Sequence, residues 1–226
     1  MCKKVVVFDL DDTLYKEIDF LKSGYRKVAK LVEKQYGFDS WDIYDQLMKW
    51  YHNGKNAFAC LNEMYGIEKP IEDYLNVYRY HLPDISLSDE TKILFDRLKE
   101  TGFILGIITD GRVITQKQKV EALRLTEWIS MDKVLINEDK NHFKPNHWSF
   151  NIMMARCYEQ CPNIEHQFYY VGDNPEKDFE APNQLGWTSI CLLDNGKNIH
   201  KQNFNCEQKK LPKKKISKIV ELIEIV

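Results

Sequence analysis

Short apolar segments recur along the chain and alternate with segments that have the period of an α-helix. Five of them are rich in β-branched or aromatic residues and short enough to be strands: 5–8, 103–108, 134–136, 168–171 and 189–193. None alternates cleanly with polar residues, which is typical of strands buried on both faces. Helical periodicity follows at 88–101, 114–125, 150–161 and 216–223. This alternation predicts an α/β fold, a doubly wound, Rossmann-like parallel sheet with helices on both faces.

One long stretch interrupts this alternation. Residues 15–82 show helical periodicity and no convincing strand, with apolar stripes such as that of Val28, Leu31 and Val32. The stretch therefore predicts a smaller α-helical domain inserted after the first strand. We expect a core domain of residues 1–15 and 86–226 and a helical domain of residues 16–85.

Composition and charge narrow the possible partners. Of 226 residues, 43% are hydrophobic and 29% charged, which is ordinary for a soluble globular protein. The formal net charge of -2 gives no field that would attract nucleic acid or an anionic membrane. No apolar stretch is long enough to span a bilayer. We expect a cytoplasmic protein without a nucleic-acid or membrane partner, and the sequence predicts no oligomeric state.

An acidic cluster follows the first predicted strand. Asp9 and Asp11 are two residues apart, and Asp12 comes next. Carboxylates held close together repel each other, and a bound cation relieves that repulsion. With a cation, Asp9 could stay ionised and attack an electrophile, while Asp11 carried a proton for the leaving group. Taken alone, however, such a cluster is also typical of turns and helix caps.

Two other strand ends carry groups that suit a phosphate. The second predicted strand ends in Thr109, Asp110 and Gly111, which offer a hydroxyl and a turn of backbone N–H groups. Lys144 follows the third strand, and its ammonium could neutralise an anionic nucleophile and a phosphoryl group. The alternatives are an ordinary strand-to-helix turn and one more surface lysine.

The fourth predicted strand runs into a second acidic segment, with Asp173 directly after the strand and Asp178 five residues on. Together with Asp9 they could complete a magnesium site, although an aspartate-rich turn would look the same. In an open parallel sheet, ligands bind outside the carboxyl ends of the strands. Four strand ends with fitting residues, in this order, predict one phosphate-transfer site.

These residues resemble the motifs of the haloacid dehalogenase superfamily, whose members are mainly phosphate-transferring enzymes. The four motifs occur in order as DLDDT from Asp9, the threonine of ITDG, the lysine of FKP, and GDNPEKD from Gly172. The resemblance covers almost the whole chain. It implies that the helical insert is the family's cap in its first-position form, and that the enzyme uses Mg²⁺.

The resemblance also implies roles for the acidic residues. Asp9 would be the nucleophile and a metal ligand, and would form an aspartyl-phosphate. Asp11 would act as general acid and then as base for the hydrolytic water, with its backbone carbonyl on the metal. Asp173 would bind magnesium. Asp178 would act on the metal directly or through water.

The resemblance assigns phosphate binding to four residues. Thr109 and Lys144 would bind the phosphate, assisted by backbone N–H groups around Asp110 and Gly111. It also implies a substrate class, because the sequence ITDGRVITQKQKVEAL looks like phosphatases of the small-nucleotide and sugar-phosphate branches.

Two positions separate branches of the superfamily. The dehalogenases lack the second aspartate of the first motif, so Asp11 argues against dehalogenation. Relatives of β-phosphoglucomutase normally have glycine where this chain has Asp12. We therefore expect a magnesium-dependent phosphatase that hydrolyses a small phosphorylated metabolite, a sugar phosphate or a nucleotide. The alternatives are a phosphomutase or phosphotransferase of the same superfamily and a member that binds without catalysis.

Overall fold

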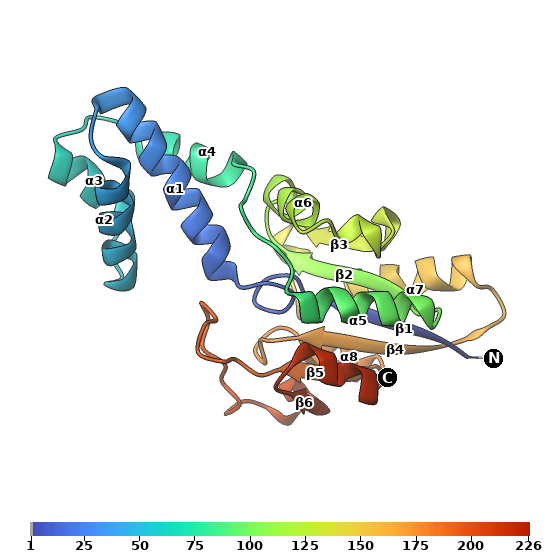
Figure 1. The fold of residues 1–226 in the computed structure, drawn as a ribbon. Helices are drawn as coiled ribbons and strands as arrows, with labels where there is room; N and C mark the ends of the chain where they lie inside the picture. Colours follow the sequence, from blue (N-terminus) through green and yellow to red (C-terminus); the bar gives the residue numbers. More distant parts are fainter. Residues whose placement is uncertain (1) are drawn as a thin grey trace. The chain divides into compact units, whose positions relative to one another are not determined.

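The computed structural model describes residues 2–226 and divides into two compact units (Figure 1). One unit comprises the residues up to Glu17 together with Ser86–Val226, and the other comprises Ile18–Ile85. The strands are β1 Cys2–Phe8, β2 Ile104–Asp110, β3 Val134–Asn137, β4 Glu165–Gly172, β5 Thr188–Leu192 and β6 Lys214–Ile216. The helices of the first unit are α5 Asp89–Glu100, α6 Val113–Ala122, α7 Trp148–Gln160 and α8 Glu180–Gln184, with short 3₁₀ turns between elements.

The six strands form one parallel sheet in the order β3-β2-β1-β4-β5-β6. β1 lies inside the sheet, so its valines are buried on both faces, as the unbroken apolar run predicted. The predicted fold class is confirmed. The apolar pattern did not predict β6, a three-residue edge strand with two exposed lysines.

Alternate residues of β1 pack on opposite faces of the sheet. Phe8 meets Phe95 of α5, with ring centroids 5.2 Å apart. Val5 and Val7 join the cluster built around Met153 of α7. Helices thus cover both faces, and the carboxyl ends of the strands are left for the polar residues that follow them.

The helical unit has its own core. It contains α1 Glu17–Tyr36, whose first residue belongs to the sheet unit, α2 Ser40–His52, α3 Ala57–Tyr65 and α4 Ile71–Tyr80. Val28 of α1, Leu47 of α2 and Leu61 of α3 are fully buried in one cluster. The side chains of Asp39 and Asn56 cap α2 and α3. No strand occurs within residues 18–85, in agreement with the periodicity.

The predicted helix over 216–223 is wrong. Ile216 is the last residue of β6, where its carbonyl accepts the N–H of Leu193 at 2.8 Å. The chain then forms a 3₁₀ helix at Ile219–Glu224. Within this helix the buried side chains of Ile219 and Leu222 are three residues apart, which suits a three-residue turn better than an α-helix. Among the described residues, no helix combines the length and apolar character needed to cross a membrane.

Candidate active site

Asp9 follows β1 directly and is held at the end of the sheet. Its N–H donates to the carbonyl of Val171 in β4 at 2.8 Å, and the residue is only 1% exposed. One carboxylate oxygen, Oδ1, accepts a bond from Lys144 Nζ at 2.6 Å, while Oδ2 is buried without a partner. Burial, with a smaller contribution from Asp178, raises the pKa of Asp9 to about 6 despite the opposing charge of Lys144.

Lys144 joins three groups at the centre of the site. Its Nζ lies 2.6 Å from Asp9 Oδ1, 2.7 Å from Asp178 Oδ1 and 3.0 Å from the hydroxyl of Tyr170. Burial alone would lower the pKa of the ammonium, but the carboxylates of Asp178 and Asp9 raise it well above the usual value. The side chain therefore stays a cation although no part of it is exposed.

Asp178 links this lysine to the loop after β4. While Oδ1 contacts Lys144, Oδ2 accepts the backbone N–H groups of Asp173 at 3.2 Å and Asn174 at 2.8 Å. Burial would raise its pKa, yet the charges of Lys144 and Lys177 and these hydrogen bonds lower it. Both oxygens of Asp178 thus have partners within the chain, so it braces the loop and the lysine.

A glycine makes room for this brace. A Cβ on Gly172 would lie 2.7 Å from Asp178 Oδ2, closer than real contacts allow. The glycine of the GDNPEKD segment is therefore explained by the close approach of a buried carboxylate.

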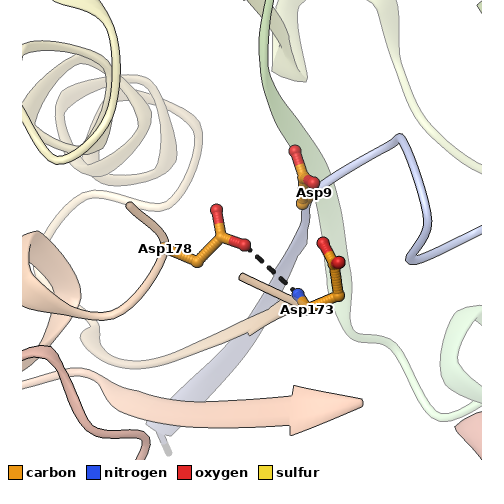
Figure 2. A group of neighbouring side chains, drawn as sticks. All are labelled: Asp9, Asp173 and Asp178. Carbon is orange, nitrogen blue, oxygen red and sulfur yellow. Dashed lines mark hydrogen bonds between the residues drawn. The ribbon is translucent and has the colours of Figure 1, made fainter. Parts of the chain in front are cut away.

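Three carboxylates come together here and fit a divalent cation. Asp9, Asp173 and Asp178 each offer an oxygen, and these oxygens lie within 4.8 Å of one another (Figure 2). Burial, then the charges of Asp178 and Asp9, raise the pKa of Asp173 to about 8, and a bound cation would relieve this repulsion. The free Oδ2 of Asp9 supplies an unused oxygen donor. An all-oxygen donor set suits magnesium, and the residues present fit this ion.

The side chain of Asp11 is engaged outside this cluster. Its Oδ1 accepts the hydroxyl of Tyr15 and lies 2.7 Å from Lys119 Nζ, and its Oδ2 accepts Gln116 Nε2 at 2.8 Å. Burial would raise its pKa, but Lys119 and these hydrogen bonds lower it. The predicted contact of its backbone carbonyl with a metal stays a prediction.

The end of β2 is tied to α6 and to β3. Thr109 Oγ1 accepts Gln116 Nε2 at 2.6 Å. The carboxylate of Asp110 accepts the side-chain amide of Asn137 at 2.8 Å and the N–H of Lys144 at 3.2 Å. Asp110 therefore positions the loop that carries the lysine.

Gly111 has a partner of its own. Its N–H donates to the carbonyl of Asn137 at 2.8 Å, and its φ of 144° is one that side chains rarely adopt. A phosphate could use this N–H only if that bond were released, so the phosphate-binding role of Gly111 stays a prediction.

Asp12 has the structure of a turn-forming residue. Its φ is 57°, in the left-handed region that glycine adopts without strain. Its carboxylate compensates by accepting the N–H of Glu17 at 2.9 Å and of Ile199 at 3.0 Å. The turn-forming alternative thus describes Asp12, whereas Asp9 is partly unpaired and buried.

Several residues of this site are not predictable from the sequence. Among them, Gln116 and Lys119 are polar residues of α6 that are 2% and 4% exposed, and Tyr170 lies within the buried strand β4. Apolar periodicity gives no signal for buried polar positions. The one available clue was the three-residue spacing between Gln116 and Lys119, just after the second motif.

Known proteins resemble this chain over most of its length. A family profile described as haloacid dehalogenase-like hydrolase matches residues 6–192. Glyceraldehyde 3-phosphate phosphatase of Methanocaldococcus jannaschii is 27% identical over 200 residues, 84% of this chain and 85% of that protein. Ribulose-1,5-bisphosphate 5-phosphatase of Halopiger xanaduensis is 26% identical over 209 residues, 82% of each.

Solved structures show the same fold. A magnesium-bound hydrolase of this type from Bacillus subtilis aligns with a TM-score of 0.61 and 20% identity, covering 100% of this chain and 99% of that one. A phosphatase from Thermococcus onnurineus aligns with a TM-score of 0.59 and 20% identity, covering 98% and 97%. The predicted enzyme class is confirmed by the curated relatives, which are phosphatases. The chain belongs to the haloacid dehalogenase-like hydrolases.

Proposed function

We propose that the protein is a magnesium-dependent phosphatase that hydrolyses a small sugar phosphate through an aspartyl-phosphate on Asp9. One observation carries this proposal: Asp9 is buried with one oxygen on Lys144 and the other without a partner, next to Asp173. A carboxylate in this state has one oxygen fixed and one available for attack. The pairing with an ammonium keeps the nucleophile anionic near neutral pH.

The surrounding residues would divide the reaction between them. Asp9 attacks phosphorus and the bond to the leaving oxygen breaks. Asp11, which must first take up a proton because its partners lower its pKa, gives that proton to the leaving oxygen. Water then attacks the phosphorus, with Asp11 accepting its proton, which returns Asp9 and releases phosphate. Thr109 holds a phosphoryl oxygen, and Lys144 holds another once it releases one of its three present partners. A magnesium ion held by Asp9 and Asp173 would neutralise the charge shared by the carboxylates and the phosphate.

The substrate class rests on the relatives. Those described above are named for phosphatase activity on a three-carbon and on a five-carbon sugar phosphate. Sugar phosphates are small, and the separate core of residues 18–85 gives this chain a helical unit of the size that would serve as a cap. We propose that this unit selects the leaving group and excludes water during transfer.

An alternative phosphotransferase would share the first step and differ in the acceptor. The residue at position 12 helps to distinguish the two activities, because mutase relatives have glycine there. In this chain both carboxylate oxygens of Asp12 accept backbone N–H groups. This difference favours a hydrolase. A non-catalytic role is disfavoured because every motif residue is retained.

The decisive assay measures phosphate release. Glyceraldehyde 3-phosphate, ribulose 1,5-bisphosphate, a nucleoside monophosphate and p-nitrophenyl phosphate are each incubated with magnesium or with EDTA. We expect release only with magnesium, and faster release from a sugar phosphate than from the nucleotide. Folded protein that releases no phosphate from any ester with any divalent ion would contradict the proposal. Conversion of the substrate to a phosphorylated isomer, without release, would identify a mutase instead.

A binding measurement tests the metal separately from turnover. Magnesium should raise the unfolding temperature of the native protein, because it binds the folded state alone. Asp173→Asn should abolish that increase. An equal increase in this variant would show that the ion binds elsewhere.

A further inference from the structure

Two residues of α6 hold the side chain of Asp11 from one side. Lys119 Nζ lies 2.7 Å from Asp11 Oδ1, and Gln116 Nε2 lies 2.8 Å from Oδ2. The hydroxyl of Tyr15 also contacts Oδ1. Each carboxylate oxygen therefore has a donor from the helix, which fixes both the position and the plane of the carboxyl group.

These contacts are buried, so water cannot easily replace them. Lys119 and Gln116 are 4% and 2% exposed, and the side chain of Asp11 is 16% exposed. An ammonium this deep in the protein requires a partner, because an unpaired buried charge is costly. The side of Asp11 that remains accessible is then the side left for a substrate.

Gln116 also sets the direction of a second group. The same Nε2 that contacts Asp11 donates to Thr109 Oγ1 at 2.6 Å. Because this hydroxyl accepts from Gln116, its own proton is left for another acceptor. One amide thus couples the group that would transfer protons to the group that would bind phosphate.

We infer that Lys119 and Gln116 are positioning residues: Lys119 aims Asp11 at the leaving oxygen, and Gln116 aims Asp11 and the Thr109 hydroxyl together. The inference rests on the proposed phosphatase function. Both residues contact Asp11, but only Gln116 is also bonded to Thr109, and this difference predicts different kinetic signatures. Loss of Lys119 impairs proton transfer alone, and loss of Gln116 impairs both proton transfer and phosphate binding.

The test compares two esters that differ in their need for a proton. Glycerol phosphate has a poor leaving group that must be protonated, and 2,4-dinitrophenyl phosphate has a good one that need not be. The constant kcat/KM reports the transfer to Asp9 and the steps before it. For Lys119→Met we expect kcat/KM to fall on the order of 10- to 100-fold with glycerol phosphate and by less than about 3-fold with 2,4-dinitrophenyl phosphate. Lys119→Arg should restore most of the loss, because it keeps a long side chain that can donate a hydrogen bond to Asp11 Oδ1.

Gln116→Met should behave differently. We expect it to lower kcat/KM for both esters and to raise the inhibition constant of inorganic phosphate several-fold, whereas Lys119→Met leaves that constant unchanged. The matched control is Lys133→Met, since Lys133 is an equally buried lysine paired with Asp132. This control variant should leave kcat/KM unchanged for both esters.

The possible failures are distinguishable. A wild-type protein that hydrolyses neither ester overturns the proposed function, and the positioning roles with it. If the wild type is active and Lys119→Met lowers kcat/KM equally for both esters, Lys119 has a structural or general electrostatic role. That result overturns the inference. If Lys119→Met does not fold, Tyr15→Phe removes another donor to Asp11 with little change in volume. This variant should likewise lose kcat/KM mainly with glycerol phosphate, the ester with the poor leaving group, and an equal loss with both esters would refute the inference.

Discussion

Replacing Lys144 by methionine removes the positive charge at the centre of the site and keeps the length of the side chain. The lysine side chain is 0% exposed, and its partners Asp9 and Asp178 are 2% and 0% exposed. Both buried carboxylates would then lose the ammonium that they contact, and only the charge of Lys177 would still act on them. Removing one partner of a buried ion pair costs about 3–5 kcal/mol. In a chain of this size, each kcal/mol lowers the unfolding temperature by about 2–4 °C.

Thermal unfolding without divalent ions, at neutral pH, measures this cost. We expect Lys144→Met to unfold roughly 6–20 °C below the native protein. Lys133→Met is the control, because its side chain is 4% exposed while that of its partner Asp132 is 55% exposed and stays hydrated. Losing a pair of that kind costs about 0–1 kcal/mol.

A double variant checks the cause. Asp178→Asn added to Lys144→Met should cost less than the two single changes together, since the carboxylate that lacked a counter-ion is gone. Equal unfolding temperatures for Lys144→Met and Lys133→Met would refute the reasoning. A loss of stability in the double variant equal to the sum of the two single losses would also refute it.

Three further changes have defined outcomes. Asp9→Asn should abolish phosphate release, by at least about a thousandfold, with an unchanged circular-dichroism spectrum, because an amide cannot serve as the nucleophile. Gly172→Ala should lower both stability and activity, because its Cβ would displace Asp178, and normal activity would show that the loop yields. Burial raises the pKa of Cys157 to about 11, so this thiol should react with Ellman's reagent at pH 8 only after denaturation. The exposed Cys2 should react at once. Fast labelling of Cys157, located by mass spectrometry, would contradict its burial.

The sheet was predictable because its strands are buried on both faces. Runs such as 5–8 leave no polar position that a helix or an exposed strand would show. β6 could not be predicted for the opposite reason, since Lys214 and Lys215 are exposed and only Ile216 is buried. Its pairing with β5 is decided by contacts far along the chain, which local periodicity does not record.

The site was predictable to the extent that its residues follow strands. Asp9, Asp173 and Asp178 lie together in the structure, as the shared edge of a parallel sheet requires. The residues that orient them lie elsewhere. Lys119 looks like a solvated helix lysine in the sequence, and only the tertiary structure places it against Asp11.

The central position of β1 has a consequence for synthesis. Val5 pairs with Ile104 on one side and with Phe168 on the other, so its second neighbour is made about 160 residues later. At about 5–20 residues per second, the first strand leaves the ribosome some 8–30 seconds before its sheet can close. Until β2 is made, Val5, Val6 and Val7 are an unpaired β-prone segment, and after that one of its two edges stays open until β4 is made. Nascent chains of this protein should therefore depend on chaperones that bind β1, and should aggregate through this strand when translation stalls before β4.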